Sequence, residues 1–116
     1  MKESGLHEPT KRWILTSYPK AFFYKTNDRS TDGIPDILAS CDGLFVGLEL
    51  KENHVLTPIQ RAVLIKISRS GGIGLVIKKK QVGSVHDFDI DKQAFVGKCY
   101  EYKTTPLKEV IRELRS

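Results

Sequence analysis

The sequence GIPDILASCDGLFVGLELK, residues 33–51, decides the fold of this 116-residue chain. It holds two runs of strand-forming residues, 37–41 and 44–51, separated only by Asp42-Gly43. This dipeptide favours a two-residue type I′ turn, because both of its residues can adopt the positive φ that such a turn requires. The stretch therefore predicts a tight β-hairpin.

A two-residue turn also fixes which residues of the hairpin face each other. Cys41 pairs with Leu44, and each later pair lies one residue further out along both strands, which places Asp36 opposite Glu49. Because side chains alternate between the faces of a strand, Glu49 and Lys51 share a face with Asp36, while most apolar residues point the other way. We expect one face to pack into the core and the other to carry charge.

Asp36 and Glu49 are like charges at cross-strand distance, and a divalent cation between them relieves their repulsion. Mg²⁺ or Mn²⁺ suits such oxygen ligands, and Mg²⁺ commonly takes one or two protein carboxylates beside water and phosphate oxygens. Lys51 would stabilise the charge of a reacting phosphate or position the attacking water, and Gly47 would leave room for a phosphate backbone. These residues predict metal-dependent hydrolysis of a phosphodiester.

Regular elements are expected on both sides of the hairpin. A helix over residues 8–17 and an aromatic strand over 21–24 precede it. After it, the apolar run 73–77 is typical of a buried parallel strand, 93–102 reads as a further strand, and 106–115 carry apolar residues at helical spacing. The chain is thus expected to be α/β, with the order α-β-β-β-α-β and then less regular elements.

A second helix is marked by its start signal. Thr57 is a favourable N-cap, Pro58 suits the first helical position, and Gln60 completes a capping box. The helix should run to about Ser70, where Gly71-Gly72 ends it. Because it lies between two strands, a right-handed β-α-β crossover is expected.

Length and composition predict a single domain over residues 1–116. Lys and Arg outnumber Asp and Glu by 19 to 14, so the net charge of +5 either favours a polyanionic partner or only aids solubility. Cys41 and Cys99 lack metal-binding spacing and are expected to be free thiols. No run is long enough to span a membrane, and no phosphate-cradling glycine motif occurs, so we expect a cytoplasmic protein without a nucleotide cofactor.

Two motifs in this order resemble a known family. Gly33-Ile34-Pro35-Asp36, followed across the hairpin by Glu49-Leu50-Lys51, resembles the PD-(D/E)xK nuclease superfamily. Glu8, Thr57-Pro58-x-Gln60 and the Gly71-Gly72 strand entry are similar to the small stand-alone VRR-Nuc branch found in phages and bacteria. The resemblance extends from the first expected helix to the lysines after the apolar strand.

This resemblance implies a restriction-endonuclease-like core, in which a mixed sheet is flanked by helices. It implies Mg²⁺ or Mn²⁺ bound by Asp36, Glu49 and the main-chain carbonyl of Leu50, with Lys51 as the catalytic lysine. Gln60 would support the site from its helix.

The resemblance also implies an outer metal ligand and a substrate class. Glu8 would be the additional ligand, with Glu3 as the alternative. Small members of the branch resemble structure-selective endonucleases that act as dimers on branched or duplex DNA, such as four-way (Holliday) junctions. A homodimer is expected because cutting two strands symmetrically needs two sites.

Several basic residues are candidates for DNA contact. Lys78-Lys79-Lys80 either line a DNA-binding face or only make the strand end soluble. The same alternatives apply to Arg61, Lys66 and Arg69, which share one side of the second helix.

Three other interpretations remain open. The hairpin could be an ordinary amphipathic one with a solvated charged face. The chain could be a non-catalytic DNA-binding module, or a restriction-type or RNA-directed nuclease on the same core.

Overall fold

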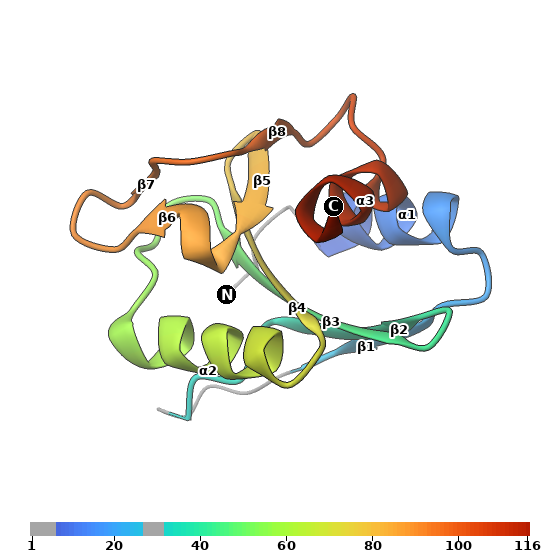
Figure 1. The fold of residues 1–116 in the computed structure, drawn as a ribbon, viewed down its shortest axis with the longest axis horizontal. Coiled ribbons are helices and arrows are strands. Elements are labelled where there is room, and N and C mark those ends of the chain that lie inside the picture. Colours follow the sequence, from blue (N-terminus) through green and yellow to red (C-terminus); the bar gives the residue numbers. More distant parts are fainter. Residues whose placement is uncertain (1–6, 27–31) are drawn as a thin grey trace.

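The computed structural model describes residues 7–26 and 32–116. The elements follow one another along the chain in this order (Figure 1): α1 (His7–Ser17), β1 (Phe22–Lys25), β2 (Ile37–Cys41), β3 (Leu44–Lys51), α2 (Pro58–Arg69), β4 (Ile73–Lys78), β5 (Gln81–Ser84), the 3₁₀ helix η1 (Val85–Asp87), β6 (Phe88–Asp89), β7 (Ala94–Phe95), β8 (Tyr100–Glu101) and α3 (Leu107–Arg115). The predicted order α-β-β-β-α-β is therefore confirmed from α1 to β4.

A mixed six-stranded sheet organises the molecule, in the order β1-β2-β3-β4-β5-β8, and β6 and β7 form a small second sheet. β3 and β4 are parallel, as the predicted crossover through α2 requires, and the other neighbours are antiparallel. α1 and α3 cover one face of the large sheet, and α2 covers the other (Figure 1). The predicted mixed sheet flanked by helices is thus confirmed.

The hairpin of β2 and β3 has the predicted turn and register. Asp42 and Gly43 have φ values of 53° and 87°, as a type I′ turn requires. The pairing runs from Cys41 with Leu44 to Ile37 with Leu48. Asp36, which precedes Ile37, and Glu49, which follows Leu48, therefore lie at the same level of the sheet.

α2 begins with the predicted capping box and packs closely on the sheet. The backbone N–H of Gln60 donates to the Thr57 hydroxyl (3.3 Å), and the backbone N–H of Thr57 donates to Gln60 Oε1 (3.0 Å). Under the helix, a Cβ on Gly74 would lie 2.5 Å from the backbone oxygen of Leu64. This glycine lets the backbone of α2 approach β4.

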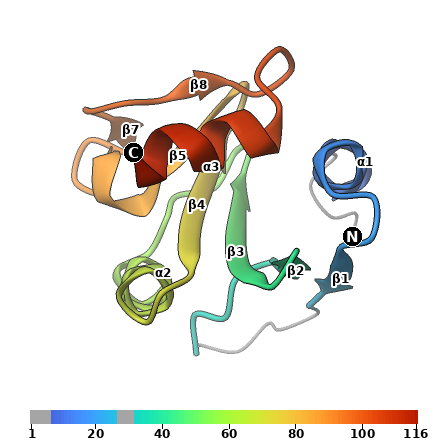
Figure 2. The ribbon, with the colours of Figure 1, turned by 45° about the vertical axis from the view of Figure 1, so that its right-hand side comes forward.

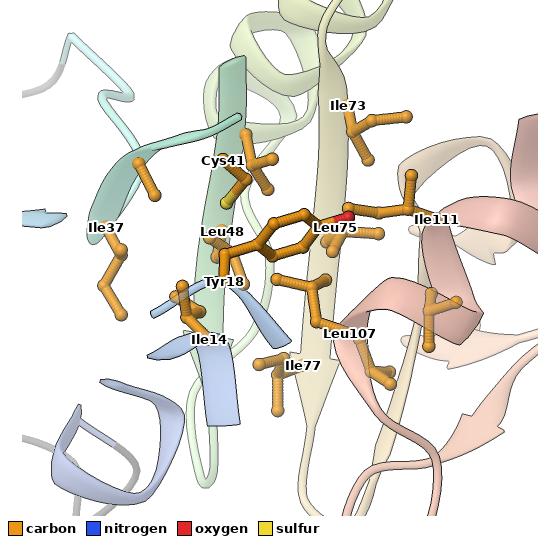
Figure 3. Packing of buried hydrophobic residues seen from close by; sticks show 14 of the residues in the cluster. Ile14, Tyr18, Ile37, Cys41, Leu48, Ile73, Leu75, Ile77, Leu107 and Ile111 are labelled. Atoms are coloured by element: carbon orange, nitrogen blue, oxygen red, sulfur yellow. The ribbon is translucent and has the colours of Figure 1, made fainter. Parts of the chain in front are cut away.

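Apolar side chains fill both sides of the sheet. The larger cluster joins the sheet to α1 and α3 (Figure 3) and includes Ile14, Tyr18, Ile37, Cys41, Leu48, Ile73, Leu75, Ile77, Leu107 and Ile111. A smaller cluster under α2 consists of Leu56, Leu64, Val76, Val85 and Phe88. Burial, and secondarily the charge of Asp42, raises the pKa of the Cys41 thiol to about 11, and both cysteines are free as predicted.

The region after β4 differs from the prediction. The lysine run does not end the sheet: Lys79 has a φ of 58° and turns the chain back into β5, a strand that was not predicted. The single strand expected over 93–102 is wrong, because β7 pairs with β6 while β8 pairs with β5. Gly97 interrupts the run where it meets the Asp87 side chain. In the described part of the chain no helix is long and apolar enough to cross a membrane.

Candidate active site

Asp36 is held at the entrance to β2 by the loop before it. Gly33 has a φ of 78°, and a Cβ there would lie 2.7 Å from the backbone oxygen of Ile59 in α2. This loop is therefore pressed against the first turn of α2 in a conformation that favours glycine. The backbone oxygen of Asp36 accepts from the N–H of Thr26 (2.9 Å), and its carboxylate accepts from the N–H of Leu50 (2.8 Å). The Asp36 carboxylate thus lies beside the last residues of β3.

Glu49 and Lys51 project from the end of β3 on the face that α2 covers. The Glu49 side chain is fully buried, that of Lys51 is 10% exposed, and Lys51 Nζ lies 3.9 Å from Glu49 Oε1. Glu49 pairs with the buried Val76 of β4, which belongs to the apolar cluster under α2. A carboxylate and an ammonium group therefore meet in largely apolar surroundings.

The alternative of an ordinary amphipathic hairpin with a solvated charged face does not hold at Glu49 and Lys51, whose side chains are buried. β3 is a central strand, and α2 with its apolar cluster covers the face of Glu49. Burying a charge costs several kcal/mol unless other groups compensate it. An ordinary amphipathic hairpin does not require this cost, so burial argues against the interpretation of Glu49 and Lys51 as surface charges.

The prediction that Gly47 leaves room for a phosphate backbone is also wrong. A Cβ at this position would lie 2.8 Å from Ile67 Cδ1 and 3.3 Å from Pro35 Cγ. The space belongs to α2 and to the loop before β2. Gly47 therefore serves helix packing.

Gln60 and Glu8 lie on the two helices near the site. The side-chain oxygen of Gln60 is engaged in the capping box of α2, and its role in the site stays a prediction. Glu8 is exposed in the first turn of α1. Its neighbour Pro9 lines a pocket with Glu52, which follows Lys51, so α1 begins at the end of the sheet where the site lies. The alternative, Glu3, lies outside the described residues.

The basic candidates differ in their surroundings. Lys78 is half-buried, and its ammonium group donates to the backbone oxygen of His54 (3.4 Å). Lys79 and Lys80 are exposed, and the backbone N–H of Lys79 donates to the backbone oxygen of Lys51 (3.2 Å). Arg61 is half-buried on α2. The lysine turn is therefore fixed to the end of β3.

The donor set fits a hard divalent cation that takes few protein ligands. Within residues 7–26 and 32–116, no group of three or more His, Cys, Asp or Glu side chains could hold a metal ion. Two carboxylates, Asp36 and Glu49, remain next to the backbone of Leu50. This number suits Mg²⁺, which commonly binds one or two carboxylates and keeps several waters.

The fold is shared with a structure of known activity. Over 90% of this chain and 98% of the other, the structure is similar to that of Hjc, a Holliday junction resolvase from the archaeal hyperthermophile Archaeoglobus fulgidus, with a TM-score of 0.57 and 17% sequence identity. The fold is thus a restriction-endonuclease-like α/β fold. No protein-family model matches the sequence, and no curated protein matches it.

A second group of residues lies near the site without any signal in the sequence. Arg12 on α1 and Lys103 after β8 line one pocket, and Lys103 also lines a pocket with Glu52. Neither basic residue belongs to a motif. Only the folded chain brings them to the end of the sheet where Lys51 lies.

Proposed function

We propose that this protein is a divalent-metal-dependent endonuclease that hydrolyses phosphodiester bonds of DNA and prefers branched DNA such as four-way junctions. One observation carries the proposal. The fully buried Glu49 lies beside Lys51, and the backbone N–H of Leu50 between them donates to the carboxylate of Asp36. The fold likeness to a Holliday junction resolvase supports the branched substrate. The motif order supports assignment to the VRR-Nuc branch. The proposal takes residues 1–116 as one nuclease domain that acts in the cytoplasm.

Each residue has a proposed role. Asp36, Glu49 and the carbonyl of Leu50 bind Mg²⁺ or Mn²⁺, which when bound supplies an activated water and neutralises phosphate charge. Lys51 holds its ammonium beside the reacting phosphate and stabilises the charge that grows there. Gln60 supports the site by fixing the first turn of α2, against which the loop before Asp36 packs.

A substrate panel tests the proposal. Four-way junction, linear duplex, single-stranded DNA and RNA are incubated with the protein in Mg²⁺, in Mn²⁺ and in EDTA. We expect the junction to be cut at least about tenfold faster than any other substrate, and only with metal, because a tenfold preference needs only about 1.4 kcal/mol of additional binding in the transition state. Faster cutting of RNA or linear duplex would favour the restriction-type or RNA-directed alternative. Binding without cutting in either metal would favour the non-catalytic module.

A homodimer is part of the proposal, and one surface of the sheet supports it. Phe22 on β1 and Phe45 on β3 are 66% and 44% exposed and both pair with Ser40, so they share one face. Tyr24, two residues along β1, is 54% exposed on the same face. α2 packs against β3 and β4, and Figure 2 shows β1 displaced from it. Leu38 pairs with Tyr24 and lies on the same face. The surface formed by Phe22, Tyr24, Leu38 and Phe45 is here called the aromatic face.

The aromatic face suits a second copy of the chain better than DNA. Exposed apolar patches commonly mark protein interfaces, and the four residues above carry no charge. In a chain with a net charge of +5, two copies meet with least repulsion through an uncharged surface. A two-fold dimer then joins the same face of both copies and supplies two sites.

Phe22→Glu is expected to weaken the dimer by at least about thirtyfold in Kd, since central aromatic residues of an interface contribute about 2 kcal/mol or more. Sedimentation equilibrium of the wild type and the variant measures this change. Val96→Glu is the matched control, because Val96 is 60% exposed but lies outside the aromatic face. A monomeric wild type, or equal loss in both variants, would contradict the proposed interface.

A further inference from the structure

Two pockets adjoin where α1 begins and the loop between β8 and α3 passes. Their volumes are about 380 Å³ and about 420 Å³. Pro9, Tyr102 and Lys103 line both, so the two pockets adjoin, and together they are here called the α1 groove. In Figures 1 and 2 the loop before α3 lies next to α1, and the Thr10 hydroxyl and the Tyr102 hydroxyl share a hydrogen bond of 3.0 Å that joins these segments.

The first half of the α1 groove is basic and lies at the end of β3, one residue beyond Lys51. Glu52, the residue after Lys51, lines it together with Lys79 and Lys80. The backbone N–H of Lys79 donates to the backbone oxygen of Lys51, which ties this half to the end of β3. The backbone N–H of Tyr102 donates to the oxygen of Lys80 (2.8 Å), so the lysine turn is also fixed to the wall of the groove.

The second half combines an aromatic ring with two cations. Trp13 lines it together with the exposed Arg12 and Lys103. The indole N–H of Trp13 donates to the backbone oxygen of Thr105 (2.8 Å), and its ring meets the Tyr102 ring edge-on at 5.2 Å between centroids. The Trp13 ring is therefore held in place before any ligand arrives.

This arrangement matches the chemistry of an unpaired nucleotide. Proteins bind single strands by combining a basic groove that follows the phosphates with aromatic rings on which bases stack. The pocket beside Trp13 has a volume of about 420 Å³. This lies at the lower end of the usual range for small-ligand sites, about 300–1,000 Å³, and a single base does not exceed that range. A base inside a duplex cannot enter it, because both of its faces are already stacked.

We propose that the α1 groove binds an unpaired segment of the DNA strand next to the cleaved bond, with phosphates at the lysines and the arginine of the groove and one base stacked on Trp13. The proposal rests on the proposed function, since it takes DNA as the substrate. It adds a selection step: substrates with unpaired bases near the cleaved bond gain a contact that fully paired duplex lacks.

Trp13 provides the test, because it is the only tryptophan of the chain. Its fluorescence is titrated with an eight-nucleotide oligo(dT) labelled for anisotropy, in EDTA so that nothing is cut. We expect saturable quenching of Trp13 in parallel with binding. Arg12→Glu with Lys103→Glu should weaken binding at least about tenfold and lower the salt slope by about 1.4, the value for two lost phosphate contacts on a single strand.

Lys92→Glu with Arg115→Glu is the matched control. Both residues are exposed, lie outside the α1 groove and give the same change of charge. The control pair should bind and quench within about twofold of the wild type. Equal losses in the two double variants, or binding without any change in Trp13 emission, would overturn the proposal.

Failure of the α1 groove and failure of the proposed function are distinguishable. If the substrate panel shows no cleavage but oligo(dT) still quenches Trp13, the nuclease proposal fails and the groove stands. If the junction is cut at the wild-type rate by the Arg12→Glu, Lys103→Glu variant and Trp13 is not quenched, the groove fails and the nuclease stands.

Discussion

Lys51→Ala is expected to lower the cleavage rate of four-way junction DNA by at least about a hundredfold while DNA binding stays within about threefold. Its side chain is 10% exposed and its ammonium group lies 3.9 Å from Glu49 Oε1, so it acts where water screens charge poorly. Removing one such preorganised group commonly costs a factor of about 10²–10³ in rate. DNA binding depends on many basic side chains, and this chain has 19 lysines and arginines. Removing one of them therefore changes the affinity for DNA little.

Single-turnover cleavage with Mn²⁺ measures the rate, and anisotropy in EDTA measures binding. Lys51→Met removes the charge but keeps most of the side-chain length, so it separates loss of the ammonium from loss of packing. Lys92→Ala, in the exposed turn between β6 and β7, is the control and should cut at the wild-type rate. Cleavage by Lys51→Ala at the wild-type rate would remove Lys51 from the catalytic role.

Asp36→Asn is expected to remove both cleavage and stabilisation by metal. Asparagine keeps the shape of the side chain and an oxygen that can accept from the N–H of Leu50, so the fold should survive. It lacks the negative charge that binds the cation. At a metal concentration of 100 times Kd, the wild type gains about 2.7 kcal/mol of stability by mass action, and the variant should gain little at the same concentration.

Thermal unfolding in increasing Mg²⁺ or Mn²⁺ measures this difference. Glu49→Gln should behave like Asp36→Asn, because both carboxylates are proposed to share one ion. Asp91→Asn, in an exposed turn, should be stabilised by metal as much as the wild type. Equal stabilisation of Asp36→Asn and the wild type would show that the metal binds elsewhere.

Local rules were enough to predict the part of the fold that carries the site. Asp42-Gly43 set the turn, the turn set the register, and the register brought Asp36 to the level of Glu49. The capping box of α2 was equally local, since Thr57 and Gln60 are three residues apart. For these elements, a short sequence pattern is enough to predict the local backbone geometry.

Features that depend on packing between distant elements could not be predicted in this way. Burial of Glu49 follows from the position of β3 in the sheet and from α2 above it, which strand alternation alone does not reveal. Gly47 was misinterpreted for the same reason, because Ile67 of α2 fills its space. The α1 groove joins Arg12 to Lys103 from opposite ends of the chain, and no local pattern marks either residue.

Anomalous diffraction from Mn²⁺-soaked crystals shows whether Asp36 and Glu49 bind one metal ion between them. We expect a manganese peak in contact with one carboxylate oxygen each of Asp36 and Glu49, at the roughly 2.0–2.6 Å that oxygen ligands keep from Mg²⁺ and Ca²⁺. A peak bound by other residues, or none in crystals of protein that cuts DNA in the same buffer, would contradict it.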